Sequence, residues 1–140
     1  MPASASPPVP PLFFTGRLKL PVIAAPMTAV SSPPELVIAA CRSGVIGSFP
    51  THNAATEREL DAWLHRMTAD SGATAAPIAP NLVVHRSNAR RDSDLAVLLR
   101  HRVEMVITSV GSPPEPVIGP LHDAGAQVFA DVASLEHARR

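Results

Sequence analysis

The sequence is poor in cysteine and in long hydrophobic runs, and it carries no net charge. Its one cysteine, Cys41, excludes a disulfide bond within the chain and fits a reducing compartment. Twelve basic and twelve acidic side chains cancel, so no overall field would attract nucleic acid or an anionic membrane surface. No apolar run approaches the roughly 18 residues that a membrane-spanning helix needs. We therefore expect a cytoplasmic protein that binds neither nucleic acid nor a membrane.

Several motifs of cofactor binding and catalysis are also missing. There is no G-x-G-x-x-G after an apolar run, no Walker loop and no G-x-S-x-G elbow. These absences disfavour a dinucleotide-binding fold, a phosphotransferase and a serine hydrolase. His52 and His85 follow predicted strands and could line the mouth of a site, but neither has a carboxylate or cysteine at metal-ligand spacing. The sequence therefore predicts no metal centre.

Short apolar runs alternate with amphipathic stretches along the rest of the chain. The runs predict buried strands at residues 22–25, 45–49, 80–84, 105–110 and 127–132. Because a strand followed by a helix recurs five times, the predicted class is α/β with a parallel sheet and right-handed crossovers. An open doubly wound sheet and a partial (β/α)8 barrel both satisfy this pattern.

The first residues differ from the rest in composition. Residues 1–11 are rich in proline, alanine and serine and have no basic side chain, which makes a poor secretory signal. We expect a disordered tail over residues 1–15 and one α/β domain over residues 16–140. The length of 140 residues falls well short of the roughly 250 of a complete (β/α)8 barrel.

Helix starts carry recognisable capping signals. A serine or threonine three residues before a glutamate can form a capping box, and this spacing occurs at Ser32, Thr56 and Ser112. Ser134 marks the start of a further helix. Cys41 falls late in the first predicted helix beside two alanines, so we expect it to be a small core residue.

Two features suggest a ligand site at the strand ends. Pro26 stops the first apolar run, and the small Ala24 and Ala25 before it leave room for something flat and large. Asn81 lies inside a predicted buried strand, where an unpaired amide costs about 1–3 kcal/mol. Either a cofactor or a neighbouring loop backbone could satisfy it. Ser109 ends the fourth run, where a small side chain suits close approach of a ligand.

Residues 20–27 (LPVIAAPM) resemble the start of nitronate monooxygenases, formerly called 2-nitropropane dioxygenases. Residues 31–36 (SSPPEL) and 44–48 (GVIGS) add to the resemblance, which covers residues 16–140. It implies a partial TIM barrel of about five βα units, with parallel strands ordered 1-2-3-4-5. It also implies FMN as cofactor and the oxidation of alkyl nitronates with molecular oxygen.

The resemblance also implies site residues. The flavin would lie against Ala25, Pro26, Met27 and Asn81, and we add Ser109 from its position at a strand end. The family's catalytic histidine and its FMN phosphate loops would lie beyond Arg140, so the catalytic residue is unknown. We therefore expect this chain to be an inactive fragment of a longer protein, and its assembly into a homo-oligomer stays open.

Two alternatives remain at this point. An FMN-dependent enoyl-acyl-carrier-protein reductase shares the Ala-Pro-Met opening and the barrel. A five-stranded flavodoxin-like binding module without catalysis would instead need the strand order 2-1-3-4-5, with helices on both faces of the sheet.

Overall fold

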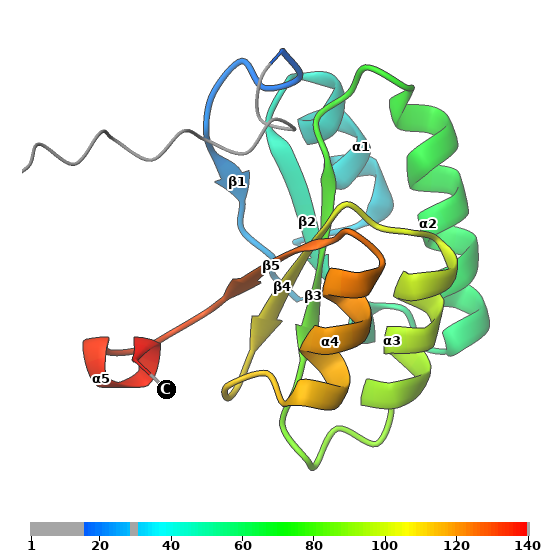
Figure 1. The fold of residues 1–140 in the computed structure, drawn as a ribbon. Coiled ribbons are helices and arrows are strands. Elements are labelled where there is room, and N and C mark those ends of the chain that lie inside the picture. Colours follow the sequence, from blue (N-terminus) through cyan, green and yellow to red (C-terminus); the bar gives the residue numbers. More distant parts are fainter. Residues whose placement is uncertain (1–15, 29–30, 140) are drawn as a thin grey trace, which may run out of the picture.

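The computed structural model describes residues 16–28 and 31–139, which form one parallel sheet with helices packed on one face (Figure 1). The predicted tail at residues 1–15 lies outside the described residues. In chain order the elements are β1 (Ile23–Ala24), α1 (Pro34–Arg42), β2 (Ile46–Pro50), the short 3-10 helix η2 (Thr51–Asn53), α2 (Glu57–Ser71), β3 (Ile78–Val83), α3 (Arg91–Arg100), β4 (Met105–Ser109), α4 (Glu115–Asp123), β5 (Gln127–Ala130) and α5 (Leu135–Ala138).

The strands follow one another in the order β1-β2-β3-β4-β5, and every neighbouring pair is parallel. Helices α1 to α4 all cover the same face, and no described helix covers the other, which we call the open face (Figure 1). This arrangement confirms the predicted partial (β/α)8 barrel. It excludes the flavodoxin-like alternative, which needs a different strand order and helices on both faces.

The two outer strands differ from the prediction. The first strand was expected to be fully buried over residues 22–25, but β1 spans two half-buried residues, and the Val22 side chain before it is 49% exposed. The last was expected over residues 127–132, but β5 ends at Ala130 and is largely exposed. Each of these strands pairs on one side only, so nothing covers its outer edge among the described residues.

The predicted helix caps are partly wrong. Thr56 and Ser134 accept hydrogen bonds from the backbone three residues on, each at 3.1 Å, as expected. Ser32 and Ser112 do not cap their helices, because α1 begins one residue later than such a cap requires and α4 two residues later, with Pro33 and Pro114 at the N-cap positions. The neighbouring proline fixes φ for the first turn and lacks an N–H, so the helix starts without a side-chain cap.

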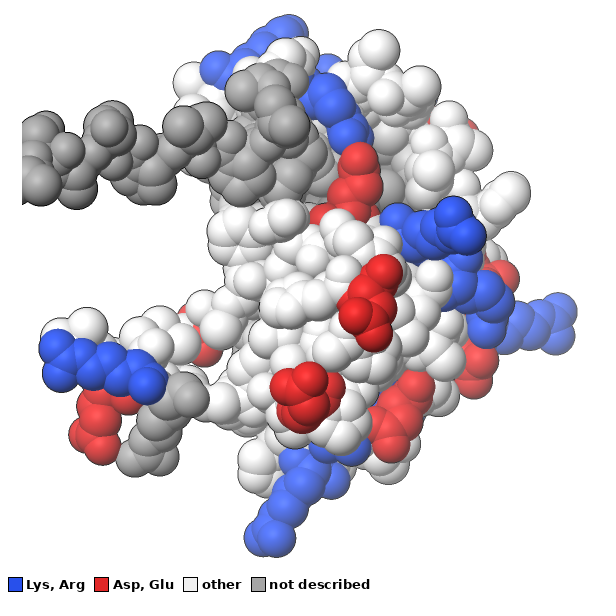
Figure 2. All heavy atoms as spheres, viewed as in Figure 1, with Lys and Arg blue, Asp and Glu red and all other residues white. Residues whose placement is uncertain are grey.

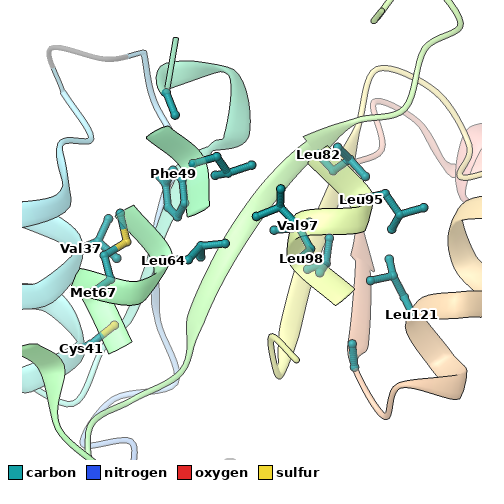
Figure 3. Close-up of a cluster of buried hydrophobic side chains, with 14 of the residues drawn as sticks. Val37, Cys41, Phe49, Leu64, Met67, Leu82, Leu95, Val97, Leu98 and Leu121 are labelled. Carbon is teal, nitrogen blue, oxygen red and sulfur yellow. The ribbon is translucent and has the colours of Figure 1, made fainter. Parts of the chain in front are cut away.

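The main core lies between the sheet and its helices (Figure 3). Phe49 from β2 is fully buried in this core, to which Leu64 of α2 and Leu98 of α3 also belong, and its ring centroid lies 6.0 Å from that of Trp63. Cys41 is buried in the same core, as predicted. Gly47 allows α1 to approach β2 closely, because a Cβ at this position would lie 2.6 Å from the carbonyl oxygen of Val37.

A smaller apolar cluster lies on the open face of the sheet, at the amino ends of the strands. It consists of Ile46, Ala79, Met105 and Ile107, with Leu18 and Ile23 packed against them. Alternation along the strands places Asn81 and Ser109 on this same face, nearer to the carboxyl ends.

The amino-terminal segment at residues 17–19 closes the amino end of the sheet. Arg17 donates one hydrogen bond to the Ala75 carbonyl oxygen at 2.7 Å and another to the Glu104 carboxylate at 2.6 Å. Lys19 donates its N–H to the carbonyl oxygen of Gly44. This segment, which we call the strap (residues 17–19), therefore links the loops that lead into β2, β3 and β4.

Candidate functional site

A hollow of about 570 Å³ lies at the carboxyl ends of the strands. Segments that follow or end all five strands contribute to its lining: Pro26, Met27, Thr28, Ser31, Pro50, His52, Asn81, Val83, Ser109, Val110 and Asp131. Ligands of α/β barrels bind at this end, where the loops converge. The volume falls within the range of pockets that hold a small organic ligand or cofactor, roughly 300–1,000 Å³.

The structure brings most of the predicted site residues together. Pro26, Met27, Asn81 and Ser109 all line the hollow. Ala25 lies next to Pro26 in the chain but is not part of the lining. Among residues singled out only for their position after a strand, His52 lines this hollow, whereas His85 lines a neighbouring one.

Asn81 is buried and has polar partners within the protein. Its Oδ1 accepts a hydrogen bond from the Ser109 hydroxyl at 3.1 Å, and its Nδ2 donates to the Ile107 carbonyl oxygen at 3.5 Å, a long contact. The second N–H of the amide has no partner among the described residues. The amide is therefore bonded to the neighbouring strand β4 and not to a loop backbone, and it keeps one N–H with which it could bind a ligand.

The turn at Met27 is held by two side chains from other segments. The N–H of Met27 donates to the Ser32 hydroxyl oxygen at 2.9 Å, and its carbonyl oxygen accepts from the Asn53 side chain at 2.9 Å. Ser32 is fully buried, whereas the Met27 side chain is 48% exposed at the hollow. Sequence reasoning missed this arrangement, since it assigned Ser32 to helix capping and had no signal for Asn53, 26 residues away.

Ser48 fixes the end of β1. Its hydroxyl donates to the carbonyl oxygen of Ala24 on the neighbouring strand. The hydrogen bond gives Ser48 a role in joining β1 to β2, and the residue does not line the hollow.

Val110 has an unusual backbone conformation at the rim. Its φ of 60° lies in the left-handed region, which is a clear outlier for a β-branched residue, and its side chain is 60% exposed. Val110 lies between the main hollow and the neighbouring one of about 320 Å³, which also includes Arg86 and Arg91. Strained backbone of this kind concentrates at functional sites. This conformation could not be predicted from the sequence, because valine after an apolar run predicts a longer strand.

The charge distribution favours a neutral or weakly polar ligand in the main hollow. Its lining contains neither lysine nor arginine, and its one carboxylate belongs to Asp131. Elsewhere, charges of both signs are interspersed over the helical side without a large patch of one sign (Figure 2). Within residues 16–28 and 31–139, no three histidine, cysteine, aspartate or glutamate side chains are grouped to hold a metal ion. None of the helices in this part of the chain is both long and apolar enough to cross a membrane.

Comparison with known proteins identifies similar folds but no family. No protein-family model matches the chain, and no curated protein matches it. Among solved structures, a nitroalkane oxidase from Streptomyces ansochromogenes superposes with a TM-score of 0.77 at 24% identity, over 91% of this chain and 44% of that one. FabK from Thermotoga maritima superposes with a TM-score of 0.75 at 22% identity, over 89% of this chain and 37% of that one. At these identities the likeness establishes the fold, and this chain spans less than half of each structure.

Proposed function

We propose that this chain forms one wall of an FMN site in a (β/α)8 oxidoreductase that oxidises alkyl nitronates with molecular oxygen. The observation that carries the proposal is the convergence of Pro26, Met27, Asn81 and Ser109 on one hollow. The resemblance of residues 20–27 to nitronate monooxygenases supports it. So does the nitroalkane oxidase among the structures with the same fold.

The chemistry of the lining fits the ring of a flavin better than its phosphate. Pro26, Met27 and Val110 offer apolar contact to a flat ring, and the free N–H of Asn81 offers a hydrogen bond to one of its heteroatoms. A phosphate dianion would need cationic or backbone donors, and the lining has no lysine or arginine. The phosphate would therefore not be held by the lining of this hollow.

FMN supplies the redox chemistry when it is bound, and the protein supplies placement and polar contacts. In this chain, Asn81 would orient the ring, and its own orientation is set by the Ser109 hydroxyl and by the backbone of β4. The apolar rim residues would exclude water from one side of the ring. We assign no catalytic base to this chain.

The experiment that tests the proposal is an NMR titration of the ¹⁵N-labelled chain with FMN and, separately, with riboflavin. We expect amide shifts at Met27, Asn81, Ser109 and Val110, and none around Arg17 at the other end of the sheet. Because the phosphate is not held here, riboflavin and FMN should bind with similar affinity. Shifts confined to other surfaces, or no saturable shifts at all, would contradict the proposal.

A matched pair of asparagine variants sharpens the test. Asn81→Ala should weaken riboflavin binding, because it removes the one buried amide that reaches the hollow. Asn88→Ala removes an amide that binds the Val83 carbonyl oxygen and does not line the hollow, so it should leave the affinity unchanged. Equal losses of riboflavin affinity in both variants would mean that the Asn81 amide supports the fold and does not contact the ligand.

The alternative of an FMN-dependent enoyl-acyl-carrier-protein reductase uses the same wall, and the residues of this hollow do not separate the two reactions. Turnover of propionate 3-nitronate with oxygen supports the monooxygenase. Reduction of an enoyl thioester driven by NADH supports the reductase.

A further inference from the structure

We propose that Ser32 and Asn53 are positioning residues that set the Pro26–Met27 turn in the form against which the flavin ring packs. The inference rests on the proposed flavin site and adds to it two residues that do not touch the ring. It also specifies that Met27 meets the ring through its side chain and the apolar surface of its backbone, and not through peptide hydrogen bonds.

The two residues satisfy both polar groups of the Met27 backbone. Ser32 lies two residues before α1 and accepts the Met27 N–H, whereas Asn53 ends η2 and donates to the Met27 carbonyl oxygen, each at 2.9 Å. The turn that follows β1 is thus tied to the start of one helix and to the segment after β2. Since Pro26 has no N–H of its own, the turn leaves few backbone donors for a ligand.

The chain contains its own comparison for Ser32. The sequence Ser-Pro-Pro-Glu occurs twice, at residues 32–35 and 112–115, and each copy leads into a helix that starts without a side-chain cap. Ser112 is exposed and makes no side-chain hydrogen bond within the described part of the chain. A helix can therefore start after this motif without help from the serine hydroxyl. The hydroxyl of Ser32 is buried and directed to the Met27 turn instead.

The hydrogen bonds at Met27 determine which group of this chain would donate a hydrogen bond to the flavin ring. Because the Met27 N–H is already bonded to Ser32, polar contact with the ring falls to the free N–H of Asn81 across the hollow. The Met27 side chain, half exposed at the rim, supplies an apolar surface. Loss of Ser32 would free the Met27 N–H and let the turn change shape, while Asn81 stays in place.

The test compares Ser32→Ala and Asn53→Ala with Ser112→Ala as the matched control. Riboflavin affinity should fall by about fivefold in each of the first two variants, the effect of one hydrogen bond of ordinary strength, and change less than twofold in the control. Hydrogen exchange of the Met27 amide in the free protein should speed up in Ser32→Ala. The absorption band of bound riboflavin should shift in both Ser32→Ala and Asn53→Ala, a change that a loss of overall stability would not produce.

Asn53→Asp provides a second test in case Ser32→Ala does not fold. Asn53 is partly exposed, and aspartate keeps its shape but has no N–H to donate, so it should weaken riboflavin binding as Asn53→Ala does. If riboflavin affinity and the spectrum of bound riboflavin are unchanged in Ser32→Ala, Asn53→Ala and Asn53→Asp, the inference is wrong, whereas the proposed flavin site is unaffected. Failure of the unmodified chain to bind riboflavin would overturn the proposed function, and the inference with it.

Discussion

The hydroxyl of Ser109 donates a hydrogen bond to the side-chain oxygen of Asn81 at 3.1 Å, so that β4 and β3 are joined by side chains as well as by their backbones. Both residues are buried on the open face of the sheet. Because this contact binds the oxygen of the Asn81 amide, its NH2 group is the part that can donate to a ligand at the rim.

We expect Ser109→Ala to destabilise the fold by about 1 kcal/mol, because it leaves the buried Asn81 oxygen without this partner. Urea unfolding followed by circular dichroism measures the effect. Ser112→Ala, which removes an exposed hydroxyl, should change the free energy of unfolding by less than about 0.5 kcal/mol. A stability of Ser109→Ala equal to that of the unmodified chain would mean that the 3.1 Å contact contributes nothing.

Gly47→Ala should be destabilising by about 1–3 kcal/mol through overpacking. The new methyl group would lie 2.6 Å from the Val37 carbonyl oxygen and 2.9 Å from the Cys41 sulfur, and α1 would have to move away from β2. Gly119→Ala is the matched control. Its methyl group would lie 3.1 Å from the end of the flexible Glu115 side chain, and alanine is the better helix former by about 1 kcal/mol. Thermal unfolding should therefore move in opposite directions for the two variants.

Val110→Gly should stabilise the chain by about 0.5–1 kcal/mol. Relief of the left-handed conformation is worth about 1–2 kcal/mol, and the greater freedom of glycine in the unfolded chain offsets part of it. Val132→Gly, at a valine that is also exposed but has no positive φ, should instead lower stability. Denaturant midpoints that fall equally in both variants would show that the Val110 conformation carries no strain.

Asp61 should contribute to loss of stability in acid. Its carboxylate accepts hydrogen bonds from Arg100 and His101, each at 2.9 Å, and these, Arg100 first, lower its pKa below the ordinary value of 3.8. A depressed carboxyl pKa stabilises the fold above the unfolded-state pKa, and this contribution disappears as pH falls through the folded-state pKa. Melting temperatures measured from pH 6 to pH 2 should therefore decline less steeply below about pH 4 in Asp61→Asn than in the unmodified chain.

Asp123→Asn is the control for the acid experiment, since this exposed carboxyl makes no ion pair with the described residues. Its melting temperatures should follow those of the unmodified chain at every pH. A matching change in slope for both variants would assign the effect to net charge and not to the bonds that Asp61 makes with α3 and the residue after it.

The open face of the sheet should promote self-association. Among the described residues, eight large hydrophobic side chains are exposed, and only Leu36 lies on a covering helix. The others lie in or next to the edge strands, at the rim or in the segment after β5: Leu20, Val22, Met27, Val110, Phe129, Val132 and Leu135. Val22→Lys should raise the dissociation constant of the oligomer at least about tenfold, since a charge at an edge strand opposes pairing. Leu36→Lys should leave it unchanged. Sedimentation velocity at several concentrations provides the measurement.

The residue pattern was sufficient for the parallel sheet and for the location of the rim. Five apolar runs separated by amphipathic stretches predicted the parallel sheet, whereas the strand order of a partial barrel came only from the resemblance of residues 20–27 to a known family. The prolyl end of the first run and the buried Asn81 predicted two sides of the same hollow. Both signals are local, because they depend on residue type and on spacing within one strand.

What the sequence could not provide depends on contacts between distant segments. The Ser-x-x-Glu pattern predicted a cap at Ser32, but two prolines shift the helix start and the hydroxyl bonds to Met27. The hydrogen bond from Asn53 to Met27 joins residues 26 apart in the sequence, and no local pattern predicts it. The left-handed Val110 is likewise invisible, since valine is a residue that favours strands.

The strap formed by Arg17, Leu18 and Lys19 has a consequence for synthesis. Its contact farthest along the chain is with the carboxylate of Glu104, just before β4. The strap can therefore reach its final position only after the ribosome has released that residue. Until then the open-face cluster around Ile46 and Ala79 is exposed to water, and a nascent chain is vulnerable to aggregation over that interval. The segment that carries Arg17 therefore makes this contact only after Glu104 has been synthesised.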